Sequence, residues 1–231
     1  MFLNLAPAVT AEQLLHRLHA DLARLGGLAE TQVADAVRVV ATRDVALGHA
    51  VVARDARLDD LQRQIERQSA ELLMRGQPLA LDVRRAVGAI KLAMGLERTG
   101  DLARNIARRG VALAAYELLP APTRSLQRMG ALVAARTRDV LDAYLARDLD
   151  RAMGVWSRDE EVDEHHNSLV RELLAAMSAD PAAVAPGAHM LMVSKTLERI
   201  GDHATGVAEL LHYEITGEDP ATPRPMGVYA L

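Results

Sequence analysis

The sequence contains no cysteine among its 231 residues, which excludes disulfides, iron–sulfur clusters and cysteine-ligated zinc. Aromatic residues are nearly as scarce, since one Phe, one Trp and four Tyr accompany a hydrophobic content of 50%. The core must therefore be built from Ala, Leu, Val, Ile and Met, a composition that favours helices over strands. Any metal ion must be bound through oxygen or imidazole.

The chain also lacks a run of basic residues. Its 27 Lys and Arg are scattered among 31 Asp and Glu, and the net charge of −4 gives no field that would attract nucleic acid. No uncharged stretch approaches the length of a membrane span, and residues 1–10 have neither the basic start nor the apolar run of a signal peptide. We therefore expect a soluble, cytoplasmic protein without a transmembrane segment.

Apolar periodicity and helix-ending residues predict six long helices. They span residues 12–44, 48–75, 79–117, 123–147, 149–179 and 184–215. Thr10 is the expected N-cap of the first helix. The clearest interruption is the stretch 119–122, because two prolines in three residues cannot continue a helix. A boundary placed there gives one unit at residues 1–119, a second at residues 120–219 and a C-terminal tail at residues 220–231.

The motif L-E-R-x-G-D occurs twice, at residues 96–101 and again 101 residues later, at residues 197–202. In each copy two acids lie four residues apart on one helix face, where like charges repel by roughly 0.2–0.5 kcal/mol. The glycine between them costs about 1 kcal/mol relative to alanine in a helix interior. Because both costs occur at two matching places, we expect the acids to have a function.

A second acid pair also recurs, as D-x-x-L-D at residues 55–59 and as D-x-x-V-D at residues 159–163. Each repeat therefore holds one acid pair on its second helix and one on its third. This duplication predicts an all-α fold of two tandem, pseudo-symmetric three-helix bundles. If the second and third helices pack side by side, the acids converge in two groups. The first acid set is Asp55, Asp59, Glu97 and Asp101, and the second acid set is Asp159, Asp163, Glu198 and Asp202.

The acids leave two interpretations open. About four acid pairs at this spacing are expected by chance in a chain of this composition, and most charges on helices only solvate a face. Alternatively, the acid sets bind metal, because four converging carboxylates are destabilising without a cation and become ligands with one. Oxygen ligands suit magnesium, calcium, manganese or iron, and zinc stays open.

The residues around the acids supply further expectations. His165 and His166 adjoin the second acid set and are candidate ligands. His203 follows Asp202 directly and so points about 100° away from it, which favours a hydrogen bond to a neighbouring helix. Four arginines each adjoin an acid pair and are expected to neutralise it. They are Arg54, Arg98, Arg158 and Arg199.

No grouping of side chains indicates catalysis. The competing enzyme hypothesis is a ferritin-like di-iron oxidase, which needs Glu-x-x-His motifs on two helices. The chain offers only Glu209 and His212, near a helix end and far from the paired acids. We therefore expect a non-enzymatic protein, and a metal-free helical adaptor stays open as an alternative.

The stretch 197–205, followed by Glu209 and by the residues 212–213 and 216–218, resembles the signature of the PhoU family of bacterial phosphate-signalling regulators. Residues 26–30 and 105–107 resemble it too, and the likeness extends from about Leu14 to Asp219. It implies two symmetric three-helix bundles whose acid motifs hold multinuclear clusters of iron or zinc. Carried over residue by residue, both acid sets are the metal-ligand positions, with magnesium or manganese as further candidates.

The resemblance also implies a function and a difference between the repeats. It implies a negative regulator of the phosphate regulon and of phosphate uptake, which links the ATPase of the phosphate ABC transporter to a sensor histidine kinase. It leaves open whether the protein forms a homodimer. The family usually has Asn-Ile-Ala-Glu after the second motif, but Gly206 stands in place of that Asn here, while Asn105 is present in the first repeat. We therefore expect the second site to be weaker or differently hydrated.

Overall fold

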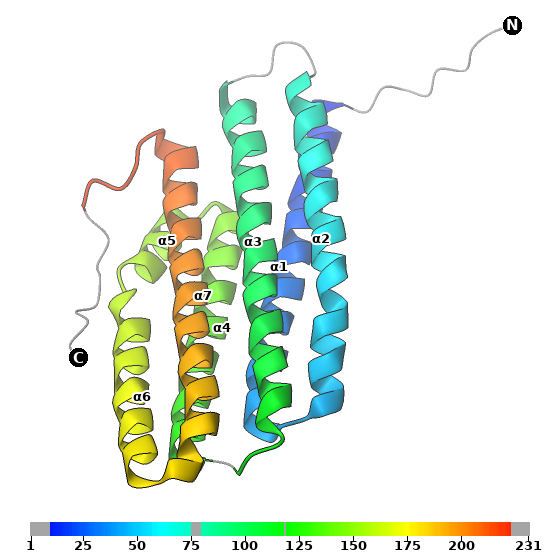
Figure 1. Ribbon diagram of the computed structural model, residues 1–231. Helices are drawn as coiled ribbons and strands as arrows, with labels where there is room; N and C mark the ends of the chain where they lie inside the picture. Colours follow the sequence, from blue (N-terminus) through cyan, green and yellow to red (C-terminus); the bar gives the residue numbers. More distant parts are fainter. Residues whose placement is uncertain (1–9, 75–79, 118, 223–231) are drawn as a thin grey trace, which may run out of the picture.

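The computed structural model describes residues 10–74, 80–117 and 119–222. Within these residues it has seven α-helices, one 3-10 turn and no strand, which confirms the all-α prediction (Figure 1). The elements are α1 (Ala11–Thr42), α2 (Val45–Met74), α3 (Ala80–Leu113), α4 (Pro120–Ala146), α5 (Leu149–Trp156), α6 (Glu160–Ala179), η1 (Pro181–Ala183) and α7 (Val184–Thr216).

The helices form two bundles that lie side by side (Figure 1). In the first bundle α1, α2 and α3 pack against one another, and in the second bundle α4, α5 and α6 pack against α7. The bundles meet where α3 contacts α7 and α1 contacts α4. The tandem-bundle prediction is confirmed, and α3 and α7, which carry the two L-E-R-x-G-D motifs, are neighbours. None of the helices described combines the length and apolar character needed to cross a bilayer.

Side chains cap several helix ends, and one of these boundaries, an Arg followed by an Asp, recurs in both bundles. Thr10 caps α1 as expected, since its hydroxyl accepts from the Gln13 backbone N–H at 3.2 Å. Asp44 and Asp148, which begin α2 and α5, each accept a backbone N–H three residues later at 2.9 Å. Arg43 and Arg147, which precede them, adopt left-handed conformations with φ of 56° and 55°. The recurrent Arg-Asp pairs are therefore helix-boundary residues.

The single helix expected over residues 149–179 is wrong, because the structure has two helices there. The Ser157 hydroxyl and the Arg158 guanidinium both donate to the Gly154 carbonyl, at 3.2 and 2.9 Å, and so satisfy the end of α5. Acidic residues then fill the first turn of α6, where the helix dipole favours negative charge. The break places Asp159 at the start of α6. The helix expected from residue 123 begins earlier, at Pro120, because prolines fit the first helical turn.

The cores are aliphatic, as the composition predicts. Along α7 the apolar residues that follow one another at alternating spacings of four and three residues are buried throughout. They are Val193, Leu197, Ile200, Ala204, Val207 and Leu211. A charged residue near the end of α7 is also buried: Glu214 is 1% exposed and accepts hydrogen bonds from Tyr144 of α4 and from Arg147, the latter at 3.2 Å. Burial raises the pKa of Glu214 above its ordinary value, while the bond from Tyr144 and the charge of Arg147 act in the opposite direction.

The raised pKa of Glu214 predicts a pH dependence of stability. Between the ordinary glutamate pKa of 4.5 and the raised value, the folded state binds a proton that the unfolded state has released. The contribution of this residue to stability therefore falls as pH rises through that window. Glu214→Gln cannot titrate, so its free energy of unfolding should decline less steeply than that of the wild type when urea unfolding is measured from pH 4.5 to neutrality. Identical slopes would contradict the expectation.

Candidate functional site

The first acid set is tied together by an arginine that follows its motif. Arg104 of α3 forms an ion pair with Asp55 of α2, and the same Nη1 lies 2.8 Å from the Asp101 carboxylate. The side chain of Asp55 is 8% exposed and that of Arg104 is 25% exposed. A guanidinium thus stands between one carboxylate from each helix.

The carboxylates of the first acid set repel one another, and this repulsion raises pKa values in the set. Burial raises the pKa of Asp55, an effect that Arg104 opposes. Burial also raises the pKa of Glu97, and repulsion by Asp101, Asp59 and Asp55, in that order, raises it further. The first acid set is therefore a group of interacting carboxylates, with Arg104 as an adjoining cation.

In the second acid set the partners are different. Asp159 is 4% exposed, and its carboxylate accepts a hydrogen bond of 2.6 Å from the Thr205 hydroxyl on α7. Glu198 is 3% exposed and lies 2.7 Å from the ammonium of Lys195, one turn away on the same helix. The side chain of Lys195 is 51% exposed, so this cation approaches the carboxylate from the solvent side.

His166, a candidate from the sequence, lies beside the second acid set. Burial lowers the pKa of His166, and the charges of Glu198 and Asp163 act to raise it. The imidazole Nδ1 is 2.7 Å from the Ser194 hydroxyl on α7, which fixes the ring orientation. A neutral imidazole held in this way has the form that ligates divalent cations. His165 is exposed.

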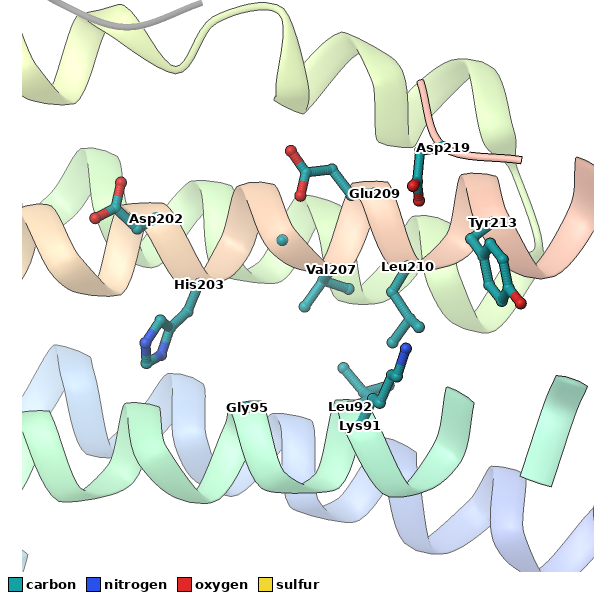
Figure 2. A pocket seen from close by; sticks show the side chains of 11 residues that line it. Lys91, Leu92, Gly95, Asp202, His203, Val207, Glu209, Leu210, Tyr213 and Asp219 are labelled. Atoms are coloured by element: carbon teal, nitrogen blue, oxygen red, sulfur yellow. The ribbon is translucent and has the colours of Figure 1, made fainter. Parts of the chain in front are cut away.

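A pocket of about 610 Å³ opens between α3 and α7, and Figure 2 shows the side chains around it. His203 points toward α3, whereas Asp202 and Glu209 point to the other side of α7 (Figure 2). The His203 Nδ1 lies 3.4 Å from the Thr99 hydroxyl, so the expected hydrogen bond between helices is confirmed. Gly206 also lines the pocket and has open space where a Cβ would stand. The expectation that Gly206 weakens the second site stays a prediction.

The motif glycines allow neighbouring helices to approach closely. A Cβ at Gly100 would lie 2.5 Å from Leu58 of α2, and a Cβ at Gly201 would lie 3.2 Å from Val162 of α6. Both glycines thus face the helix that carries the other acid pair of their repeat. The helix-propensity cost of each glycine is balanced by this contact, which brings together the two helices that carry the acid pairs.

The two glycines should respond differently to alanine. We expect Gly100→Ala to lower the free energy of unfolding by about 1–3 kcal/mol, because Leu58 must move in a packed core. Gly201→Ala is the matched control, and its cost should be smaller because the Val162 methyl needs to shift by only a few tenths of an ångström. Urea unfolding of both variants measures the difference. A gain in stability for Gly100→Ala, as helix propensity alone dictates, would contradict the close approach.

The two acid sets differ in how well they fit a metal ion. Among the residues that the structure describes, no three His, Asp or Glu side chains are arranged to hold one. In the first acid set the Arg104 guanidinium stands where a bound cation would contact Asp55 and Asp101, so this set does not fit a metal. The second acid set offers carboxylates beside an imidazole, a donor set that suits divalent cations once Lys195 turns toward solvent.

Arg104 was not predicted from the sequence as part of a site. Two of the four expected neutralising residues have other partners, since Arg54 pairs with Asp35 of α1 at 2.9 Å and Arg158 donates to Gly154. The signal for Arg104 is its position three residues after Asp101, a spacing at which helical side chains form ion pairs.

The two residues of the competing oxidase motif have different partners. Glu209 accepts a hydrogen bond from Trp156 at 3.1 Å, while the His212 Nδ1 lies 2.8 Å from the Glu218 carbonyl.

The fold and the repeated motifs define a class: all-α proteins of two tandem helical bundles, each with acid pairs on two neighbouring helices. The family model described as the PhoU domain matches this sequence twice, at residues 22–110 and 126–211. The chain belongs to the PhoU family.

Known proteins are similar to this chain over most of its length. A curated relative from Caulobacter vibrioides, named phosphate-specific transport system accessory protein PhoU homolog, is 53% identical over 93% of both chains. A relative of the same name from Rhizobium meliloti is 40% identical over 91% of this chain and 89% of its own. The crystal structure of PhoU from Pseudomonas aeruginosa matches 90% of this chain and all of its own, with a TM-score of 0.87 and 32% identity.

Proposed function

We propose that this protein is a non-enzymatic accessory protein of phosphate transport that lowers phosphate uptake and phosphate-regulon expression when phosphate is sufficient. The observation that carries the proposal is the similarity to the Caulobacter vibrioides relative, which is 53% identical over 93% of both chains and is named for the phosphate-specific transport system. Agreement over the whole length means that both bundles, and not a single shared domain, underlie the proposed role.

The proposed mechanism is a relay through protein contacts at the cytoplasmic face of the membrane. The protein contacts the ATPase of the phosphate ABC transporter and a sensor histidine kinase, and it catalyses no reaction itself. Long helices in two bundles that meet where α3 contacts α7 and α1 contacts α4 are suited to this task, because such bundles move as rigid bodies when a partner binds at one end.

Metal binding is part of the proposal, as a structural or switching element. The ligands would be the second acid set, with His166 as an additional donor. Carboxylates that bridge can hold more than one ion, and iron, zinc, magnesium and manganese all accept such ligands. The bound cations would neutralise carboxylates that otherwise repel one another within a buried part of the bundle.

A metal-free adaptor is the second candidate. The side-chain arrangement within the described residues favours it, because Lys195 already pairs with Glu198 and no three ligands converge. Metal analysis of protein purified without added metal separates the two candidates.

The partner proposal is tested by binding in vitro. Purified protein is mixed with the phosphate transporter in detergent and analysed by size-exclusion chromatography, with an unrelated ABC transporter as the control. We expect co-elution with the phosphate transporter alone. Equal binding to both transporters, or to neither at micromolar concentrations, would contradict the proposal.

A further inference from the structure

Arg104 and Thr205 occupy the same position in the two repeats, three residues after the second acid of each L-E-R-x-G-D motif. Each side chain contacts the corresponding aspartate on the neighbouring helix, Asp55 for Arg104 and Asp159 for Thr205. Corresponding positions of the two acid sets are therefore occupied by chemically different groups, a guanidinium in the first and a hydroxyl in the second.

The contact in the first repeat brings a full positive charge. Arg104 binds Asp55 of α2 and lies 2.8 Å from Asp101 of α3. Because Asp55 is 8% exposed and Arg104 is 25% exposed, dissolved salt screens the interaction little. A metal ion would have to displace the guanidinium from two carboxylates at once and leave that charge partly buried without a partner.

The contact in the second repeat brings no charge. The Thr205 hydroxyl donates one hydrogen bond to one oxygen of Asp159 and leaves the negative charge of the carboxylate in place. Two cations lie nearby. Arg136 is buried, but its guanidinium donates to the backbone carbonyls of Arg158 and Asp159 and pairs with Glu161 at 2.7 Å. Lys195, which pairs with Glu198, has a side chain that is 51% exposed and can turn into solvent without being buried alone.

We infer that Arg104 is the built-in cation of the first acid set, so that this set takes no metal ion and metal binding by the chain is confined to the second acid set. Metal binding at the second acid set rests on the proposed function, whereas the exclusion of metal from the first acid set depends only on the ion pairs of Arg104. The assignment is opposite to the expectation based on Gly206, in which the second site is the weaker one.

The first arm of the test uses the full-length protein, stripped with EDTA and dialysed against Mn²⁺. The double variant Glu97→Gln, Asp101→Asn, treated in the same way, should contain as much Mn²⁺ per chain as the wild type. A fall in Mn²⁺ content in this double variant would show that the first acid set binds metal in the presence of Arg104, and would overturn the inference. This arm stands even if no Arg104 variant folds.

The second arm removes the guanidinium. Arg104→Thr copies the second repeat and should raise Mn²⁺ content about twofold over the wild type, because both sets then bind. Arg104→Lys keeps the charge and should match the wild type. Adding Glu97→Gln and Asp101→Asn to Arg104→Thr should return the content to the wild-type value. If Arg104→Thr folds, as judged by its helical circular dichroism, and gains no Mn²⁺, the inference is overturned.

The same experiment separates the inference from the proposed function. If the wild type binds no Mn²⁺ but Arg104→Thr does, the role of Arg104 is supported and the proposed metal role of the second acid set fails. If neither protein binds Mn²⁺, both fail.

Discussion

Among the glycines that the structure describes, Gly88 is the one where we expect substitution by alanine to be most destabilising. The new Cβ would overlap the buried Glu214 carboxylate, which approaches α3 at this glycine. Glu214 would have to leave its partners, Tyr144 and Arg147, or α3 would have to move away from α7. Overpacking costs about 1–3 kcal/mol and the loss of a buried ion-pair partner about 3–5 kcal/mol, so we expect a loss near 3 kcal/mol in the free energy of unfolding.

Gly95→Ala is the matched control for this variant. Gly95 lies two turns further along α3, and nothing stands within 4 Å of the point that its Cβ would occupy. Replacing a helical glycine with alanine there should raise the free energy of unfolding by about 0.5–1 kcal/mol. Urea unfolding of the two variants therefore gives changes of opposite sign. A small effect of Gly88→Ala, equal to that of Gly95→Ala, would contradict the close approach of Glu214 to α3.

The second large effect concerns metal. If metal binds at the second acid set as proposed, the double variant Glu198→Gln, Asp202→Asn should lose most of it, because two carboxylates become neutral amides. The loss of affinity should exceed the roughly 10–100-fold caused by changing groups outside the ligand shell. Elemental analysis by mass spectrometry gives the metal content per chain. The corresponding variant of the first acid set, Glu97→Gln with Asp101→Asn, is the control.

Unchanged metal content in the Glu198→Gln, Asp202→Asn variant would argue against the second acid set as the binding site. Circular dichroism must first show that the variant keeps its helices. The substitutions preserve side-chain shape, and Lys195, the ion-pair partner of Glu198, has a side chain that is 51% exposed and can remain solvated. Folding should therefore be retained, and the metal measurement remains decisive.

The architecture could be predicted from the sequence because two independent signals agreed. The apolar spacing along residues 193–211 gave the buried seam of α7, and the duplicated acid motifs gave the two bundles. The close approach at Gly100 and Gly201 was also predictable, since glycine in a helix interior has a cost that tight packing can balance. These features depend on local pattern, which a single sequence carries.

The features that the sequence did not reveal depend on contacts between elements or on unusual helix ends. The break between α5 and α6 arises from two side chains that bond back to the Gly154 carbonyl, and apolar periodicity continues across it. The role of Arg104 depends on the register of α3 against α2, which brings Asp55 within its reach. Gly206 departs from a family pattern that the sequence shows, whereas the difference between Thr205 and Arg104, one residue earlier in each repeat, acquires its meaning only from their contacts with Asp159 and Asp55.

The regulatory role is tested most directly in a strain that lacks this protein and carries a phosphate-responsive reporter. In excess phosphate, we expect the reporter to remain active in the deletion strain and to be repressed again when the wild-type protein is supplied from a plasmid. A reporter that stays repressed in the deletion strain under phosphate excess would contradict the proposed function.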